Sequence, residues 1–218
     1  DHPRVSAVLL AVGLAVTVFR GAYEQVGNTV ALWADSGVDR VVGTMTIPGT
    51  WFQSLNPLLV MLMTPPLLAY WHRRSQAGRE HSALQKMAIG ALIVAGSYLL
   101  LAAVAAASSP GHASWLWLVL FFVIFTLGEL FILPTGLGLF ARLAPAGVVA
   151  TTVAAWFFAI FTGSLFAGAL GTLWSSLGQP AFFTALAAIA TTAAGLLLSI
   201  DRPARKVEAA HGRGGSRP

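Results

Sequence analysis

The stretch WLWLVLFFVIFTLGELFILPTGLGLFAR, residues 115–142, is almost wholly apolar and carries a single carboxylate, Glu129, at its middle. A hydrocarbon core of about 30 Å is crossed by about 20 helical residues, so the stretch is long enough to span a bilayer. An ionisable side chain at that depth costs about 2.5–3.5 kcal/mol on insertion scales and typically handles a solute or a proton. The segment therefore predicts a transmembrane helix with a functional carboxylate inside it.

The rest of the chain also has the composition of a membrane protein. It is 56% hydrophobic and 10% charged, with a mean hydropathy of +0.75, whereas an average soluble protein carries about 25% charged residues. Backbone amides in lipid must be paired within a segment, so the spans must be helices. We predict an all-α membrane protein of six transmembrane helices within residues 1–200, with spans near 5–34, 46–71, 83–107, 115–142, 148–176 and 181–200.

The basic residues predict the orientation in the membrane. Only Arg40 falls on one side of the predicted spans, and eleven Lys and Arg fall on the other: Arg4, Arg73, Arg74, Arg79, Lys86, Arg142, Arg202, Arg205, Lys206, Arg213 and Arg217. The positive-inside rule then places both termini in the cytoplasm of a multi-pass plasma (inner) membrane protein. Residues 201–218 are expected to form a basic, solvated and disordered cytoplasmic tail. The net charge of +5 is thus explained by orientation and does not indicate nucleic-acid binding.

Six spans make up one half of a two-bundle transporter, in which spans one and four hold equivalent places beside a central cavity. The carboxylates of Glu24 and Glu129 fall on these two spans. We therefore expect both to face a water-filled space between bundles. Because the chain starts Asp-His-Pro-Arg without an initiator Met, we expect a fragment of a longer transporter, with the other half missing.

Residues 19–28, Phe-Arg-Gly-Ala-Tyr-Glu-Gln-Val-Gly-Asn, place Arg20, Glu24 and Asn28 four residues apart on one helical face. Glu24 can therefore pair with Arg20. One interpretation is a proton-coupling carboxylate that takes up a proton when Arg20 moves away and releases it when Arg20 returns. The other is a static ion pair that neutralises two buried charges.

A second polar cluster lies in Trp51-Phe-Gln-Ser-Leu-Asn-Pro57, where Gln53 and Asn56 share a face and Pro57 frees a carbonyl one turn earlier. These amides either bind solute or join helices. Glu129 has no cation within a turn of its own helix, so it is either protonated or able to bind a cationic ligand, such as the α-amino group of a peptide. A partner on the missing half is the alternative.

Several classes of site are disfavoured. The chain has no cysteine, and none of its histidines lies within a predicted span, so no metal site is expected. Nucleophile-elbow, zincin and P-loop motifs are absent from the sequence, and we expect no enzymatic activity and no cofactor. Trp156, in the fifth span, either borders a side-chain pocket or packs in the core.

Five strings in this order resemble the carboxy-terminal six-helix bundle of the proton-dependent oligopeptide transporter family, within the major facilitator superfamily. They are Tyr23-Glu24-Gln25, Trp51 to Pro57, Gly128-Glu129-Leu130 with Pro134 and Gly136-Leu137, Leu143-Ala-Pro145, and Trp156-Phe157. The resemblance runs from about Val5 to Ile200.

The resemblance implies a symporter of di- and tripeptides, driven by the proton gradient and working by alternating access. It implies that Glu24 takes part in proton coupling, that Glu129 binds the peptide amino terminus with help from Asn56, that Gln25 lines the cavity, and that Trp156 lines a side-chain pocket. In many members an aromatic residue stands where this chain has Arg20, which alters the electrostatics beside Glu24.

A second departure is Leu133, where many members have serine. The family's ExxER-type motif and the residues that receive the peptide carboxylate belong to the amino-terminal bundle, outside this chain. Two other functions remain open: another major facilitator transporter, exporting drugs or importing nitrate, and a membrane scaffold without transport activity.

Overall fold

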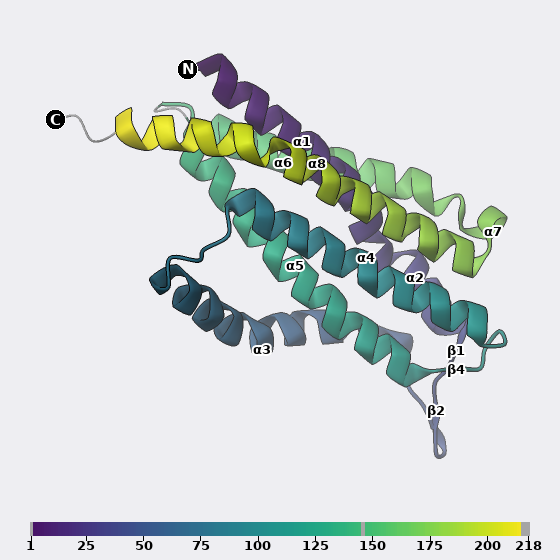
Figure 1. The fold of residues 1–218 in the computed structure, drawn as a ribbon. Helices are drawn as coiled ribbons and strands as arrows, with labels where there is room; N and C mark the ends of the chain where they lie inside the picture. Colours follow the sequence, from purple (N-terminus) through teal and green to yellow (C-terminus); the bar gives the residue numbers. More distant parts are fainter. Residues whose placement is uncertain (1, 145–146, 215–218) are drawn as a thin grey trace.

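The computed structural model describes residues 2–144 and 147–214 (Figure 1). Pro145 of the Leu143-Ala-Pro145 string and residues 215–218 of the expected tail lie outside these ranges. The elements are α1 (His2–Tyr23), the 3-10 helix η1 (Glu24–Gly27), α2 (Thr29–Ser36), β1 (Val38–Asp39), β2 (Val41–Val42), β3 (Met45–Thr46), α3 (Gly49–Gln76), α4 (Ala83–Ala107), β4 (Ala113–Ser114), α5 (Trp115–Leu143), α6 (Val149–Gly171), α7 (Trp174–Leu177) and α8 (Gln179–Gly214).

The predicted class, an all-α membrane protein with six spans, is confirmed. Six helical stretches of the described chain are long and apolar enough to cross a membrane: Pro3–Ser36, Gly49–Gln76, Ala83–Ala107, Trp115–Leu143, Val149–Gly171 and Gln179–Ala209. The strands are two residues long and lie in the connections, where β1 pairs with β4 and β2 pairs with β3.

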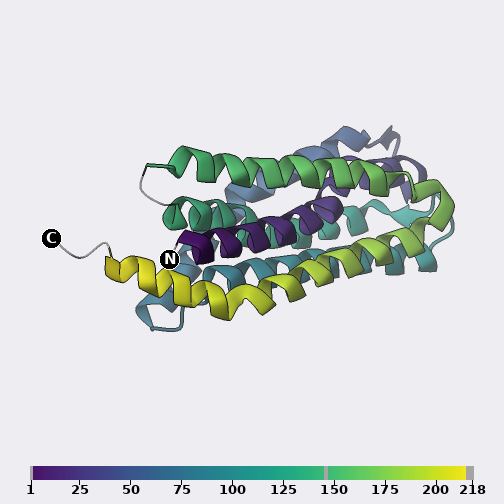
Figure 2. The same ribbon diagram turned by 90° about the horizontal axis from the view of Figure 1, so that it is seen from above.

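The helices form one elongated bundle, in which α1 starts and α8 ends at the same end (Figures 1 and 2). Helix α4 packs against α5 and α8, and α1 packs against α6 and α8, whereas α3 packs mainly against α5. Large apolar side chains on the outer faces of α3 and α6 are exposed: Leu58, Met61, Leu62, Leu68, Phe157, Phe158, Phe161 and Leu165. A hydrocarbon environment suits these surfaces, because most apolar area of a helix in lipid needs no protein cover.

The first span is broken in its second half, which the sequence analysis did not predict. Helix α1 ends at Tyr23, a 3-10 turn runs over Glu24–Gly27, and α2 starts at Thr29. The amide of Gln53 on α3 donates a hydrogen bond to the carbonyl of Val26 at 3.1 Å. The break thus leaves a backbone carbonyl to be paired by a side chain of a second helix. Such pairing is required at membrane depth, because no water is present there to bond to the carbonyl.

Helices α4 and α5 approach most closely where Gly90 faces Gly128. A Cβ atom added at Gly128 would lie 2.7 Å from the carbonyl oxygen of Gly90, and one added at Gly90 would lie 2.6 Å from the carbonyl oxygen of Gly128. Small residues permit such backbone contact between transmembrane helices. The crossing fixes the depth and rotation of the next residue on α5, Glu129.

The carboxy-terminal region differs from the sequence expectation. Residues 201–214 continue α8 as helix instead of forming a disordered tail. Asp201, which is 4% exposed, accepts hydrogen bonds from the Ser82 hydroxyl and, at 3.3 Å, from the Gln85 amide, and it pairs with Arg205 at 2.5 Å. Ser82 and Gln85 also form the capping box that starts α4. The end of α8 is thus tied to the start of α4.

Two other spans depart from the simple expectation. Helix α3 runs without interruption through Pro57, Pro65 and Pro66, so the backbone donor that Pro57 lacks does not end the helix. The fifth span ends at Gly171, where α6 stops, and the short α7 follows as a separate element.

Candidate functional site

The ion pair expected within the first span is present. The guanidinium of Arg20 pairs with the Glu24 carboxylate one turn later, and the Ser164 hydroxyl on α6 donates to the same carboxylate at 3.1 Å. The Arg20 side chain is 11% exposed and that of Glu24 is 32% exposed. Gly163 on α6 makes room for Arg20, since a Cβ atom at Gly163 would collide with the Arg20 Cβ. The pair thus lies between α1 and α6, with Glu24 the more accessible partner.

Glu129 is held by side chains from two other helices. The Tyr23 hydroxyl donates to Glu129 Oε1 at 2.6 Å, and Asn56 Nδ2 donates to Glu129 Oε2 at 2.7 Å. Asn56 Nδ2 also lies 3.1 Å from the Thr126 hydroxyl oxygen. Glu129 is 9% exposed. Its partners on α1 and α3 are neutral donors, which orient the carboxylate without neutralising its charge.

Tyr23 connects the two acidic groups. The Arg20 guanidinium carbon lies 4.6 Å from the centroid of the Tyr23 ring, and the Tyr23 hydroxyl bonds to Glu129. The two carboxylates and the Arg20 guanidinium therefore share one network across α1, η1 and α5. The sequence analysis did not select Tyr23 as a site residue, although its spacing of three from Arg20 placed it on the same helical face.

Gln25, expected to line the cavity, is fully buried instead. Its Nε2 donates to the carbonyl oxygens of Ala167 at 2.8 Å and Gly21 at 3.2 Å, and its Oε1 accepts from the Thr29 hydroxyl at 3.0 Å. The whole amide group joins the 3-10 turn to α6. In this arrangement Gln25 stabilises the helix break, and its side chain has no exposed surface in the described chain.

Trp156 packs between α5 and α6 and is 2% exposed. Its ring meets the Phe140 ring edge to face with centroids 5.3 Å apart, and it covers Gly136, where a Cβ atom would collide with the indole. Of the two interpretations of Trp156, core packing fits this position.

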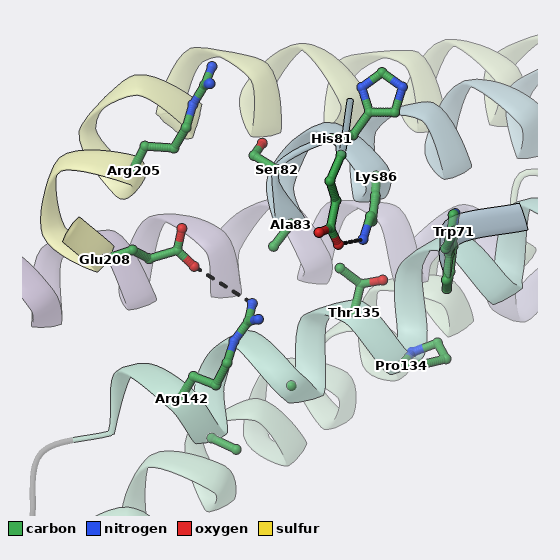
Figure 3. A pocket seen from close by; sticks show the side chains of 13 residues that line it. Trp71, His81, Ser82, Ala83, Lys86, Pro134, Thr135, Arg142, Arg205 and Glu208 are labelled. Carbon is green, nitrogen blue, oxygen red and sulfur yellow. Dashed lines mark hydrogen bonds and ion pairs between the residues drawn. The ribbon is translucent and has the colours of Figure 1, made fainter. Parts of the chain in front are cut away.

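A cavity of about 740 Å³ lies away from these residues, where the ends of α3, α5 and α8 meet the start of α4. Its charges pair with each other: Lys86 lies 2.8 Å from Glu80, and Arg142 lies 3.7 Å from Glu208 (Figure 3). The hydrogen bond from Lys86 lowers the pKa of the Glu80 carboxyl below its usual value. Lys86 also lies 5.0 Å from the centroid of the Trp71 ring. Paired charges of both signs suit a brace between helix ends, and none of the predicted site residues lines this cavity.

Among the described residues no group of three or more His, Cys, Asp or Glu side chains could hold a metal ion. The chemistry of the site is that of hydrogen bonds and ion pairs.

These features define the class of protein: one six-helix bundle of a major-facilitator-type membrane transporter, with an acidic site on its first and fourth spans. The POT family model matches residues 4–189, and the chain belongs to the POT family.

The similarity to individual peptide transporters supports the same family assignment. The chain is 28% identical over 212 residues, 95% of its length, to the di-/tripeptide transporter of Lactococcus lactis subsp. cremoris, of which it spans 42%. It is 34% identical over 161 residues, 72% of its length, to the peptide transporter YePEPT of Yersinia enterocolitica, of which it spans 32%. The chain thus spans less than half the length of these relatives.

A solved structure, the peptide transporter POT in complex with sulfate, superposes with a TM-score of 0.83 and 27% identity over 91% of this chain and 41% of that one. A second, a POT family transporter in complex with a thioalcohol-conjugated peptide, has a TM-score of 0.83 at 24% identity and supports the fold alone. These relatives are named as transporters rather than enzymes, in agreement with the sequence prediction.

Proposed function

We propose that the chain is the carboxy-terminal six-helix bundle of a proton-coupled di- and tripeptide symporter that works by alternating access. The observation that carries the proposal is Glu129, a carboxylate in the middle of a membrane span whose two oxygens are oriented by Tyr23 and Asn56 from two other helices. Family membership and the peptide transporters among the relatives support the choice of substrate.

In this proposal Glu129 binds the amino group that every di- and tripeptide with a free amino terminus carries. An ammonium group is a strong donor to a carboxylate, and such charge-assisted hydrogen bonds are about twice as strong as neutral ones. Asn56 orients the second oxygen of the Glu129 carboxylate, and its own side chain lies beside the proposed amine site. The missing amino-terminal half would supply the groups that receive the peptide carboxylate.

Glu24 with Arg20 is the proposed proton-coupling pair. Glu24 has two partners, the Arg20 guanidinium and the Ser164 hydroxyl, and its side chain keeps the larger exposed fraction. Protonation of Glu24 would release Arg20, whose Nε is buried without a hydrogen-bond partner among the described residues. A freed Arg20 could then pair with an acidic group of the opposite bundle, which links the proton to a change in how the halves meet.

The test is uptake of labelled dialanine by the complete transporter in proteoliposomes, with and without an imposed proton gradient. Glu129→Gln should weaken dialanine binding, whereas Glu24→Gln should abolish gradient-driven accumulation but retain exchange of internal for external peptide. Glu80→Gln is the matched control, because Glu80 lies outside the site in the connection before α4. Export of drugs or import of nitrate by a protein that ignores dialanine would contradict the proposal, and so would variants that behave like the unaltered protein, as a scaffold predicts.

The proposed orientation places both termini in the cytoplasm of the plasma membrane. This chain has no cysteine, so in a complete transporter whose other half is also free of cysteine a single substitution reports topology. Ser75→Cys, at the end of α3, should react only with a membrane-permeant maleimide in intact cells, and Ser109→Cys, after α4, should react with an impermeant one. The opposite pattern would reverse the proposed orientation.

A further inference from the structure

The side chain of Tyr23 is fixed on three sides. Its hydroxyl donates to Glu129, the Arg20 guanidinium lies over one part of its ring, and the Phe125 ring of α5 stacks on it at 5.3 Å between centroids. Tyr23 is therefore in contact with the amine-binding carboxylate and with the cation that pairs with Glu24. Among the described residues, no other side chain is joined to both groups by a hydrogen bond, an ion pair or a cation–π contact.

The hydrogen bonds to Glu129 orient the carboxylate and do not block it. Each oxygen of an ionised carboxylate can accept about two hydrogen bonds. Tyr23 uses one position on Oε1 and Asn56 uses one on Oε2. One position on each oxygen thus remains for an ammonium group, and the direction of these two positions depends on the donors that hold the carboxylate.

We propose that Tyr23 is a positioning residue for both acidic groups, whose hydroxyl aims Glu129 at the peptide amino group while its ring holds Arg20 against Glu24. The proposal rests on the proposed function and adds to it a residue that decides how strongly a free amino terminus is preferred. It also assigns separate tasks to the hydroxyl and to the ring of one side chain, and the hydroxyl can be removed without the ring.

The contacts of Tyr23 allow the task of its hydroxyl to be tested separately from that of its ring. Tyr23 itself contacts Arg20 on α1 and Glu129 on α5, while Glu24, Asn56 and Ser164 bond to these charged groups and not to Tyr23. Tyr23→Phe removes the hydroxyl alone, so the stacking on Phe125 and the ring face under Arg20 remain. Tyr23→Leu removes the hydroxyl and the ring together.

The experiment measures, in the complete transporter, how strongly dialanine and N-acetyl-dialanine compete for uptake of labelled dialanine. The acetylated peptide has the same side chains but no ammonium group. In Tyr23→Phe the preference for dialanine over its acetylated form should fall about tenfold, the usual effect of losing one hydrogen bond to a charged group. The ratio of gradient-driven accumulation to exchange should stay unchanged. In Tyr23→Leu that second ratio should fall as well.

Tyr70→Phe is the matched control, because the Tyr70 hydroxyl lies on the exposed face of α3 and contacts only Arg74 among the described side chains. It should change neither ratio. Both readouts are ratios within one variant, so they do not depend on how much protein folds.

An unaltered preference for dialanine in Tyr23→Phe, in a transporter that takes up dialanine normally, overturns the role of Tyr23 alone. An equal loss of affinity for both peptides overturns it too, because the hydroxyl would then act on the fold and not on amine recognition. A wild-type protein that takes up no dialanine overturns the proposed function, and this inference with it.

Discussion

Replacement of Gly128 by alanine should destabilise the bundle, although alanine is the better helix former. The added Cβ would lie 2.7 Å from the Gly90 carbonyl oxygen, 2.7 Å from Val94 Cγ2 and 3.0 Å from the Val94 nitrogen. Two of these three atoms belong to the backbone of α4 and cannot turn aside as a side chain would. The two helices must therefore move apart.

The expected cost is about 1–3 kcal/mol, the usual range for an extra methyl group in a packed core. It outweighs the gain of about 0.5–1 kcal/mol that alanine brings over glycine inside a helix. Gly138→Ala, ten residues further along α5, is the matched control, because nothing lies within 4 Å of a Cβ atom there. That variant should be as stable as the unaltered protein or slightly more so.

The assay is reversible unfolding of the purified complete protein in mixed detergent micelles, followed by dialanine uptake of both variants. Because Gly128 precedes Glu129, separating α4 from α5 should also shift the carboxylate away from Asn56 and raise the KM for dialanine. If Gly128→Ala were as stable as Gly138→Ala, the close crossing of α4 and α5 would be wrong. If it were destabilised without a change in KM, the crossing would stand, but its role in placing Glu129 would fail.

Three other predictions follow from contacts outside the proposed binding groups. Gln25→Leu should destabilise the protein by about 1–3 kcal/mol, because it leaves buried partners on α2 and α6 unpaired, while Gln76→Leu at the exposed end of α3 should not; equal thermal stability of the two would refute the buried role. Asp201→Ala should speed backbone amide exchange in residues 202–214, since the end of α8 loses its tie to α4; unchanged exchange would show that this helix needs no such tie. Lys86→Met should raise the pKa of the Glu80 carboxyl toward its usual value, as read by a carboxyl NMR titration. Because the folded pKa is the lower one, the pair stabilises at neutral pH and is lost as the pH falls through that value, and the effect should be small because the pair is exposed.

Local geometry explains which parts of the site the sequence could predict. Arg20 and Glu24 are one helical turn apart, so their pairing follows from helix geometry alone. The depth of Glu129 follows from its place at the middle of an apolar stretch long enough to span the bilayer. Both inferences need only the positions of residues within one segment.

The contacts between helices could not be predicted in that way. Tyr23 and Glu129 are 106 residues apart and Asn56 and Glu129 are 73 apart, so their hydrogen bonds depend on how α1, α3 and α5 pack. The burial of Gln25 likewise depends on the approach of α6. The helical course of residues 201–214 was missed because a basic, Gly-containing composition indicates solvation, while the Asp201 contacts with α4 depend on the fold.

The break in the first span gives one short string three separate tasks. Tyr23 is the last residue of α1 and reaches α5, Glu24 starts the 3-10 turn and bonds to α6 through Ser164, and Gln25 bonds to the α6 backbone at Ala167. Consecutive residues on a helix point about 100° apart, so three neighbours in sequence can serve three directions. Because Gln25 holds the turn and takes no part in the polar network, changes at Tyr23 and Glu24 should alter recognition and coupling without unfolding the break. A change at Gln25 should impair both together, since it moves the frame from which the other two residues project.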